Sequence, residues 1–533
     1  MPDGSGELRQ LAVRSVGSTL LSGGFGLAIQ IVSAAVLARL LTPKDFGLVT
    51  MVTTFSLLLV NFGLNGFTEA VVQREVIDHK LASNLFWINV GGSLALSVGF
   101  AAAGALLSRL YHDPRVIGVT RALALTIFLT GLSVIHLALL KRAMRFSVVS
   151  ANDMIARAVS VVVAILLAWA GWGYWALVVA AVALPTSTCI GAWASCRWVP
   201  GFPRQSAGTR PAVRFAIHTY GRFSTGYFAN NLDNFLFGWM LGPTPLGFYK
   251  KAYDLFVLPS NQLSIGLTTV AVSALSRLRR DAIQYKQYFL SALGVMAFVG
   301  MGLSAALTLV GKDLIFLLLG SQWGEAGRIF TLFGPGIGFM LLYCTHIWLH
   351  LSMGRADRWF RWGMVDLIVT TVFLVVGLHW RSEGIALAWV LSYWIITLPA
   401  LWYAGKPIHL AISSVVAVIW KYLLASAVAG GATFLIAQAI PSLVTAAGPT
   451  GALVRLVAIS LMFVSLYLGT VILLHGGCGP IYLIARLVRE MASRSKFSAE
   501  ASPSEGAAGR PESPEIDFPP APELAARCLD EVG

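Results

Sequence analysis

The feature that most constrains this chain is a succession of apolar runs, each about twenty residues long, the length that an α-helix needs to cross a bilayer. We place such runs near residues 16–40, 46–68, 85–107, 116–140, 154–170, 174–196, 215–238, 253–275, 289–310, 327–352, 361–379, 383–403, 421–440 and 453–475. Backbone polar groups in hydrocarbon must be satisfied within the segment itself, so these spans are expected to be helices. The sequence therefore predicts an all-α polytopic membrane protein of about fourteen transmembrane helices.

Composition supports the same class and excludes others. Of the 533 residues, 56% are apolar and only 12% are charged, and the mean hydropathy is +0.73, far from an ordinary water-soluble domain. The net charge of +14 is spread over short clusters between the apolar runs rather than along one soluble face, which argues against nucleic acid as a partner. The five cysteines show no metal-ligand spacing, and no cofactor or metal-binding motif is found.

The distribution of Lys and Arg predicts how the spans are oriented. Connections after even-numbered spans hold seventeen basic residues, whereas the opposite connections hold seven. Basic residues are enriched in loops on the cytoplasmic side. Both termini are therefore expected to be cytoplasmic.

An internal repeat links the two halves of the chain. Residues 12–72 align with residues 212–272 without a gap, and thirteen of the 61 pairs are identical, among them Pro43 with Pro243 and Gly47 with Gly247. Six spans separate the copies, so the repeat is parallel. We predict an N-lobe of spans 1–6 (residues 1–200), a C-lobe of spans 7–12 (201–410), two extra spans (411–480) and a largely disordered cytoplasmic tail (481–533).

Polar residues at membrane depth are the candidate functional residues. The seventh span carries Thr219, Arg222, Gly226, Asn230 and Asp233 at spacings that place them on one helical face. The first span has a matching but uncharged stripe. Since such faces do not favour lipid, they predict a hydrated pathway between two lobes, and a buried charge at Arg222 or Asp233 favours function.

Further polar residues extend this hypothesis. The second span adds Asn61, Asn65 and Glu69, and the eighth adds Asn261. For these amides, substrate contact and interhelical hydrogen bonding are both open. Arg121 and Arg157 lie within spans, where an inward guanidinium would attract a phosphate and an outward one would extend to the interface. His346 and His350, one turn apart, are interpreted as structural.

Two stretches resemble a known family. Residues 37–74, beginning LARLLTPKDFGL, and residues 230–280, beginning NNLDNFLFGWML, are similar to Wzx-type flippases, the polysaccharide transporters of the multidrug/oligosaccharidyl-lipid/polysaccharide superfamily. The resemblance covers residues 10–480 and is strongest in these two stretches.

The resemblance implies a two-lobed bundle that moves an undecaprenyl-pyrophosphate-linked oligosaccharide across the inner membrane by alternating access, for exopolysaccharide, capsule or O-antigen synthesis, without enzymatic chemistry. It implies cavity positions at Arg222, Asn230, Asp233, Asn61 and Glu69, and coupling to a proton or sodium gradient, which we place at Asp233. A polysaccharide polymerase and chain-length machinery are implied partners. Membrane lipids surround the bundle.

Two other functions are consistent with parts of the pattern. A drug or cation antiporter of the same superfamily would share the twelve-span core, but it would carry more carboxylates inside its lobes than Asp233 and Asp366. A membrane glycan polymerase or ligase would need a long outer loop carrying bases and arginines. The longest outer connection here is short, from Lys312 to Glu325.

Overall fold

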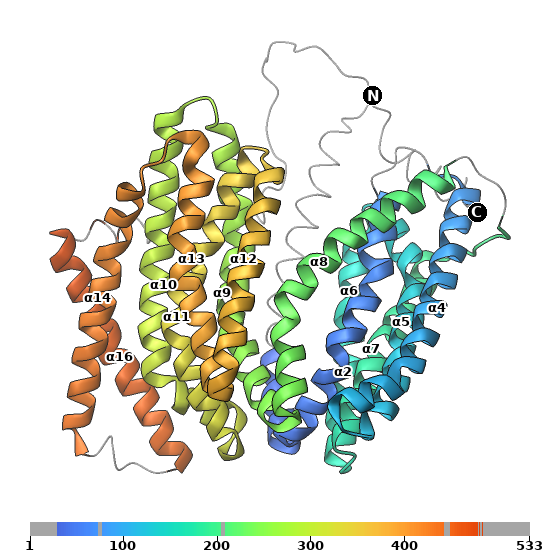
Figure 1. Ribbon diagram of the computed structural model, residues 1–533, viewed down its shortest axis with the longest axis horizontal. Coiled ribbons are helices and arrows are strands. Elements are labelled where there is room, and N and C mark those ends of the chain that lie inside the picture. The colour runs from blue at the N-terminus through green and yellow to red at the C-terminus, as the bar shows by residue number, and fades with distance from the viewer. Residues whose placement is uncertain are drawn as a thin grey trace, which may run out of the picture. The chain divides into compact units, whose positions relative to one another are not determined.

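The computed structural model describes residues 29–72, 77–203, 208–441 and 448–477, together with Gly479 and Tyr482 (Figure 1). Every regular element within these ranges is a helix. Of the predicted first span, 16–40, only residues 29–40 are described, and they are helical. The predicted polar stripe of this span consists of Thr19, Ser22, Gly26, Gln30 and Ser33, of which only Gln30 and Ser33 are described. The tail apart from Tyr482 also lies outside the described residues.

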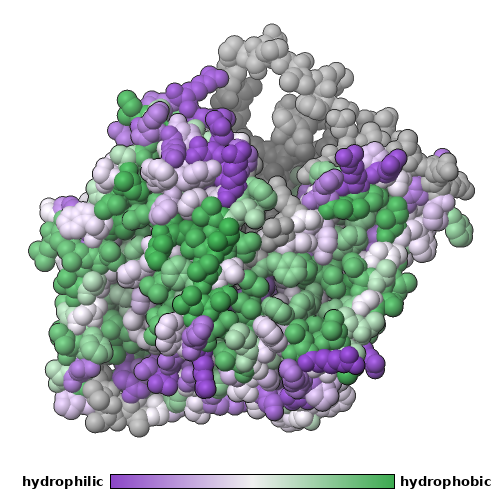
Figure 2. All heavy atoms as spheres, in the orientation of Figure 1, coloured by the Kyte–Doolittle hydropathy of each residue, from purple (hydrophilic) through white to green (hydrophobic). Residues whose placement is uncertain are grey.

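Thirteen long helices follow within the described residues. They are α2 (Pro43–Phe62), α4 (His79–Tyr111), α5 (Arg115–Arg142), α6 (Phe146–Trp169), α7 (Tyr174–Cys196), α8 (Thr209–Leu241), α9 (Pro243–Arg277), α10 (Ala282–Leu319), α11 (Gly324–Ser352), α12 (Ala356–Gly377), α13 (Arg381–Gly405), α14 (Ile412–Ala439) and α16 (Gly448–His475). Ten stretches are long and apolar enough to cross a membrane, and one of them contains both α12 and α13. Figure 2 shows hydrophobic side chains over the middle of the helices and hydrophilic ones gathered near their ends. The all-α polytopic fold is confirmed.

The helices match the predicted spans closely because bilayer thickness dictates the apolar length. α7 begins and ends where the sequence predicted, at residues 174 and 196. α9 has the largest difference at a single end: it begins at Pro243, well before the predicted residue 253. Proline is favoured at the first helical position, so the helix starts there and carries the charged residues Lys250 and Lys251 within its first turns.

The described chain divides into two compact units. Unit 1 contains Met51–Phe228 with the residues up to Leu41, and unit 2 contains Thr42–Thr50 with the residues from Ala229 onward. Thus α2 and α8 each contribute one part to unit 1 and another part to unit 2. The predicted lobes, 1–200 and 201–410, follow the sequence repeat instead and stay a prediction.

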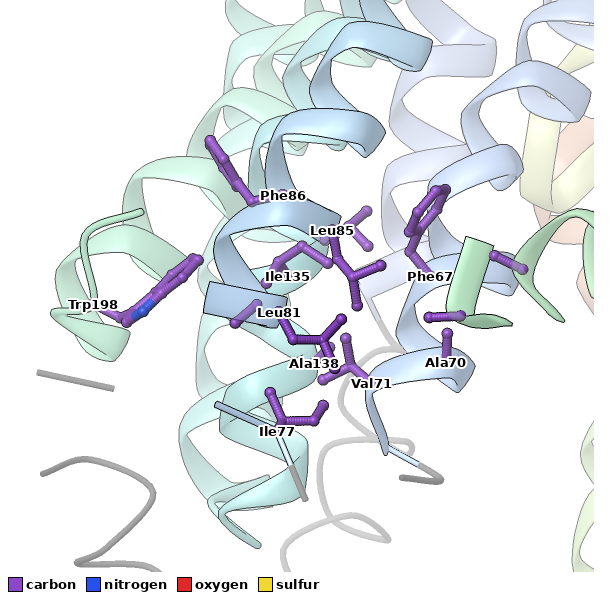
Figure 3. Packing of buried hydrophobic residues seen from close by; sticks show 14 of the residues in the cluster. Phe67, Ala70, Val71, Ile77, Leu81, Leu85, Phe86, Ile135, Ala138 and Trp198 are labelled. Carbon is purple, nitrogen blue, oxygen red and sulfur yellow. The ribbon is translucent and has the colours of Figure 1, made fainter. Parts of the chain in front are cut away.

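In unit 1, α4 lies along α5, α6 lies along α7, and α5 packs against α7. Figure 3 shows the apolar cluster, in which Leu85 lies beside Ile135 and to which Phe67 also belongs. The chain after α7 folds onto this cluster: the indole nitrogen of Trp198 donates to His79 Nδ1 (3.2 Å). The indole nitrogen of Trp87 donates to the carbonyl of Gly201 (2.8 Å). These contacts fix the path that leads from α7 toward α8.

In unit 2, α11 packs against α9, α10 and α13, while α12 lies on α13. The two extra helices, α14 and α16, pack on α10 and on each other. An ion pair ties α16 to α10: the Arg455 guanidinium donates to the Asp313 carboxylate, with its shortest contact at 2.6 Å. Nearby, the Tyr467 hydroxyl donates to the carbonyl of Phe298 (2.7 Å).

Replacing Arg455 with alanine should loosen the two extra helices. The Asp313 side chain is only 17% exposed, so removing the Arg455 guanidinium leaves a poorly solvated carboxylate without its ion-pair partner. This should lower the free energy of unfolding by about 2 kcal/mol. Thermal unfolding of the purified protein in detergent measures the loss. Arg328→Ala is the control, because that arginine is 61% exposed and lies 3.6 Å from its partner Glu325. Equal losses in both variants would contradict a structural role for the pair.

Candidate functional site

Asp233 is the buried carboxyl of unit 2, on the second half of α8, and is 1% exposed. Its Oδ1 accepts a hydrogen bond from the backbone N–H of Asn234 (2.8 Å). Its Oδ2 accepts from the Tyr249 hydroxyl of α9 (2.5 Å). The indole N–H of Trp389, on α13, donates to that same hydroxyl (2.9 Å). Three helices therefore meet in one hydrogen-bonded chain that ends on a carboxylate.

An aromatic shell encloses this chain. The ring of Tyr249 stacks on Phe237, with centroids 4.6 Å apart. Tyr253 contacts Trp389 at 5.6 Å and Phe333, from α11, at 5.9 Å. Apolar surroundings make an isolated charge costly, so a carboxyl kept at this position needs its donors. The site therefore holds one carboxyl buried among aromatic rings, with a hydrogen-bond donor on each of its oxygens.

Two lysines follow Tyr249 on α9. Lys250 Nζ lies 2.7 Å from Asp254 Oδ1, one turn away on the same helix. Lys251 Nζ lies 4.0 Å from the centre of the Phe46 ring, on α2. The first turns of α9 thus place positive charge close in sequence to the tyrosine that binds Asp233. A lysine over an aromatic face is attracted to the ring's negative face.

The polar contacts of unit 1 join the first half of α8 to α2. The Tyr220 hydroxyl donates to the carbonyl of Leu58 (3.1 Å), and the Tyr227 hydroxyl donates to that of Thr54 (2.8 Å). Directly after α2 in the chain, a π-helical turn at Gly63–Phe67 separates α2 from α3 (Thr68–Val72). Such turns widen a helix and recur at functional sites. This one contains Asn65, one of the predicted cavity residues.

The predicted site residues fall into three groups. Asp233 is brought together with partners from two other helices. Asn61 is half-buried and its Nδ2 donates to the Leu57 carbonyl of its own helix (2.7 Å), while Glu69 is exposed on α3 and Asn261 is exposed on α9. The side chains of three more predicted residues, Arg222, Asn230 and Asn65, lie outside the described residues.

The two predicted arginines of the N-lobe are both exposed. Arg121 lies on α5. Arg157, on α6, contacts Asp153 one turn away on its own helix at 2.8 Å, and both side chains are 54% exposed. An exposed pair within one helix contributes little to stability. The role of these arginines in binding substrate stays a prediction.

Sequence reasoning missed the partners of Asp233. One signal was present: Tyr249, Tyr253 and Phe256 are spaced four and three apart, which places three aromatic rings on one face of α9. The sequence analysis named Asp366 as a carboxylate inside the lobes but not its hydrogen-bond partner. On α12, the Thr370 hydroxyl donates to Asp366 Oδ1 (3.2 Å). His346 and His350, interpreted from sequence as structural, are both buried on α11.

Comparisons with known proteins give the family and the fold. The family described as "Polysaccharide biosynthesis protein" matches residues 36–328. The succinoglycan biosynthesis transport protein ExoT of Rhizobium meliloti (strain 1021) is 24% identical over 72% of this chain and 78% of its own. The teichuronic acid biosynthesis protein TuaB of Bacillus subtilis (strain 168) is 24% identical over 75% of this chain and 84% of its own.

Among solved structures, the lipid II flippase MurJ in an inward closed conformation has a similar fold. The TM-score is 0.69 at 12% identity, and the similarity covers 85% of this chain and 97% of that one. At this identity the likeness concerns the fold. The all-α polytopic fold is therefore shared with a protein described as a flippase.

Proposed function

Since the chain belongs to the polysaccharide biosynthesis protein family, we propose that it is a flippase for an undecaprenyl-pyrophosphate-linked oligosaccharide. It moves this lipid from the inner to the outer leaflet for exopolysaccharide, capsule or O-antigen synthesis. The observation that carries the proposal is the fold: nearly the whole length of a lipid II flippase aligns with this bundle. The relative described as a succinoglycan transport protein supports a polysaccharide precursor as the substrate.

The mechanism is alternating access between two related helical repeats. The polar headgroup and glycan enter a hydrated pathway, while the polyprenyl tail stays in lipid. Its apolar surface is therefore never exposed to water. Arg222 attracts the pyrophosphate through its guanidinium. Asn230, Asn61, Asn65 and Asn261 offer amides to sugar hydroxyls. Glu69, Arg121 and Arg157 complete the set of substrate-contacting candidates.

Asp233 is the coupling residue in this mechanism. Its carboxyl is buried and receives hydrogen bonds from Tyr249 and Asn234, so binding a proton or Na⁺ there changes the charge of a buried site. A ligand shifts a conformational equilibrium by the difference in its affinity for the two states. Cation binding at Asp233 therefore biases which side of the membrane the pathway faces.

The protein lies in the bacterial inner membrane with both termini in the cytoplasm, as the Lys and Arg asymmetry favours. In this orientation, α2 and α9 begin at the outer surface and α8 begins at the inner one. A polysaccharide polymerase and its chain-length machinery take up the lipid-linked repeat after translocation.

Deleting the gene in the producing bacterium tests the proposal. Lipid-linked repeat units should accumulate in the cytoplasmic leaflet, where a membrane-impermeant glycan-oxidising reagent does not reach them in intact cells. Accumulation in the outer leaflet would instead indicate a lost polymerase or ligase. Normal polysaccharide with a new sensitivity to toxic cations would indicate an antiporter, and either result would overturn the flippase assignment.

A further inference from the structure

The two copies of the sequence repeat contact each other through a matched pair of glycines. Gly47 is on α2 and Gly247 is on α9, at equivalent positions 200 residues apart. A Cβ added to Gly47 would collide with the carbonyl oxygen of Pro243, and one added to Gly247 would collide with that of Pro43. These positions would also lie 3.0 and 3.2 Å from the backbone nitrogen of the opposite glycine. The contact is backbone to backbone, and it is reciprocal.

Both helices are built to begin at this contact. α2 and α9 each start at a proline, Pro43 and Pro243, which is favoured at the first helical position. At the start of α2, Thr42 and Asp45 cap each other: the Thr42 N–H donates to Asp45 Oδ2 (2.9 Å) and the Asp45 N–H donates to Thr42 Oγ1 (3.3 Å). The first turns of α2 and α9 are therefore well defined, and only glycine, which has no side chain, allows their backbones to approach this closely.

Aromatic contacts hold the start of α2 at this position. The Phe46 ring meets the edge of Trp323, with centroids 5.5 Å apart, and Phe248 meets the same indole at 5.9 Å. Trp323 is fully buried. From Met51 onward, however, α2 belongs to unit 1. The first copy of the repeat thus contacts the second through the first turns of α2, which continues as one helix into unit 1.

We infer that Gly47 and Gly247 are positioning residues for transport: their contact holds the outer end of the pathway closed and separates when that end opens. The inference rests on the proposed function and on the proposed orientation, which puts both first turns at the outer surface. Small residues that let helices touch through their backbones favour one discrete arrangement over a continuum. A side chain at either glycine would destabilise the closed arrangement and leave the separated one unaffected, which shifts the population.

Accessibility of two reporter cysteines in the full-length chain tests this inference, in a background where Cys189, Cys196, Cys344, Cys478 and Cys528 are replaced by alanine. Leu246→Cys reports on the outer end, because Leu246 is fully buried beside Gly247. Thr219→Cys reports on the inner end, because Thr219 lies in the first half of α8, which begins at the inner surface in the proposed orientation. Membrane-impermeant maleimide is applied to right-side-out and to inside-out vesicles.

Gly47→Val should raise outside labelling of Leu246→Cys about tenfold and lower inside labelling of Thr219→Cys, because a shift of 1.4 kcal/mol changes a population ratio tenfold. In Gly247→Val the reporter Leu246→Cys would be adjacent to the substituted residue, and its labelling would be affected directly. For this variant, only the decrease in inside labelling of Thr219→Cys is therefore measured. Should a valine variant fail to reach the membrane, Gly47→Ala gives the same comparison with a smaller side chain.

The matched control is another glycine pair that lies within one repeat. A Cβ on Gly300 would lie 3.2 Å from Gly338 Cα, and one on Gly338 would lie 3.1 Å from the Gly300 carbonyl oxygen. Gly300→Val should lower thermal stability without changing either labelling. Unchanged labelling in Gly47→Val, or increased labelling of both reporters, would overturn the inference. The reporters need no substrate, so the inference can fail or hold independently of the gene-deletion result.

Discussion

Replacing Asp233 with asparagine is expected to reduce polysaccharide export strongly while the protein still folds and reaches the membrane. Asparagine keeps the size of the side chain and can still accept from the Tyr249 hydroxyl, but it binds neither a proton nor Na⁺ as a carboxylate does. If the cation binding at Asp233 supplies 1.4 kcal/mol or more of coupling, export should fall at least about tenfold. Surface glycan per cell, normalised to membrane-inserted protein, measures the change.

The control for this variant is Asp357→Asn, which removes an exposed carboxyl from the first turn of α12 and should leave export unchanged. Tyr249→Phe adds an independent test. It removes the donor to Asp233 Oδ2 and leaves the carboxyl in place, so export should persist at a reduced rate and respond differently to dissipation of the proton or sodium gradient. Normal export by a correctly inserted Asp233→Asn protein would remove Asp233 from the mechanism.

The approximate positions of the helices could be predicted because the length of an apolar run follows from one physical quantity, the thickness of the bilayer. α7 matches the predicted limits at both ends. Helix α9 was predicted to begin too late because an apolar window excludes charged residues. A helix can include them, and its start is set by the backbone, here at Pro243. The charges Lys250 and Asp254 pair one turn apart on the helix surface, so they do not end it.

The carboxyl of the candidate site was predictable and its surroundings were not. Asp233 shares a helical face with other polar residues, and that face is a property of the local sequence. Its donor Tyr249 lies 16 residues away and Trp389 lies much further along the chain. Their proximity depends on how α8, α9 and α13 pack, which no local pattern encodes.

The repeat was visible from sequence identity, and Gly47 and Gly247 were among its matched pairs. Identity alone does not distinguish a glycine kept for a turn from one kept for a close approach. Only the packed structure shows that each glycine faces the proline carbonyl of the other copy. Pseudosymmetry then explains why both positions are glycine: a reciprocal contact places the same steric demand on each partner.

Phe333→Ala is expected to be the most destabilising single substitution in the shell around Asp233. Phe333 is fully buried, and its ring stacks on Phe256 with centroids 4.6 Å apart and touches the rings of Tyr249 and Tyr253. Helices in a membrane are held by packing rather than by exclusion of water, so an empty volume here loses contacts outright. Truncating a buried phenylalanine costs about 3–5 kcal/mol.

The midpoint of thermal unfolding in detergent, compared with that of Val372→Ala, measures this effect. Val372 lies on α12 in the same unit but is 55% exposed, so its truncation should change the midpoint little. Phe333→Leu should fall between the two, because it fills part of the volume. The loss in Phe333→Ala should also reduce export beyond what the amount of folded protein explains, since the ring supports the tyrosine that donates to Asp233. A shift no larger than that of Val372→Ala would mean that the shell is loosely packed and does not position the carboxyl.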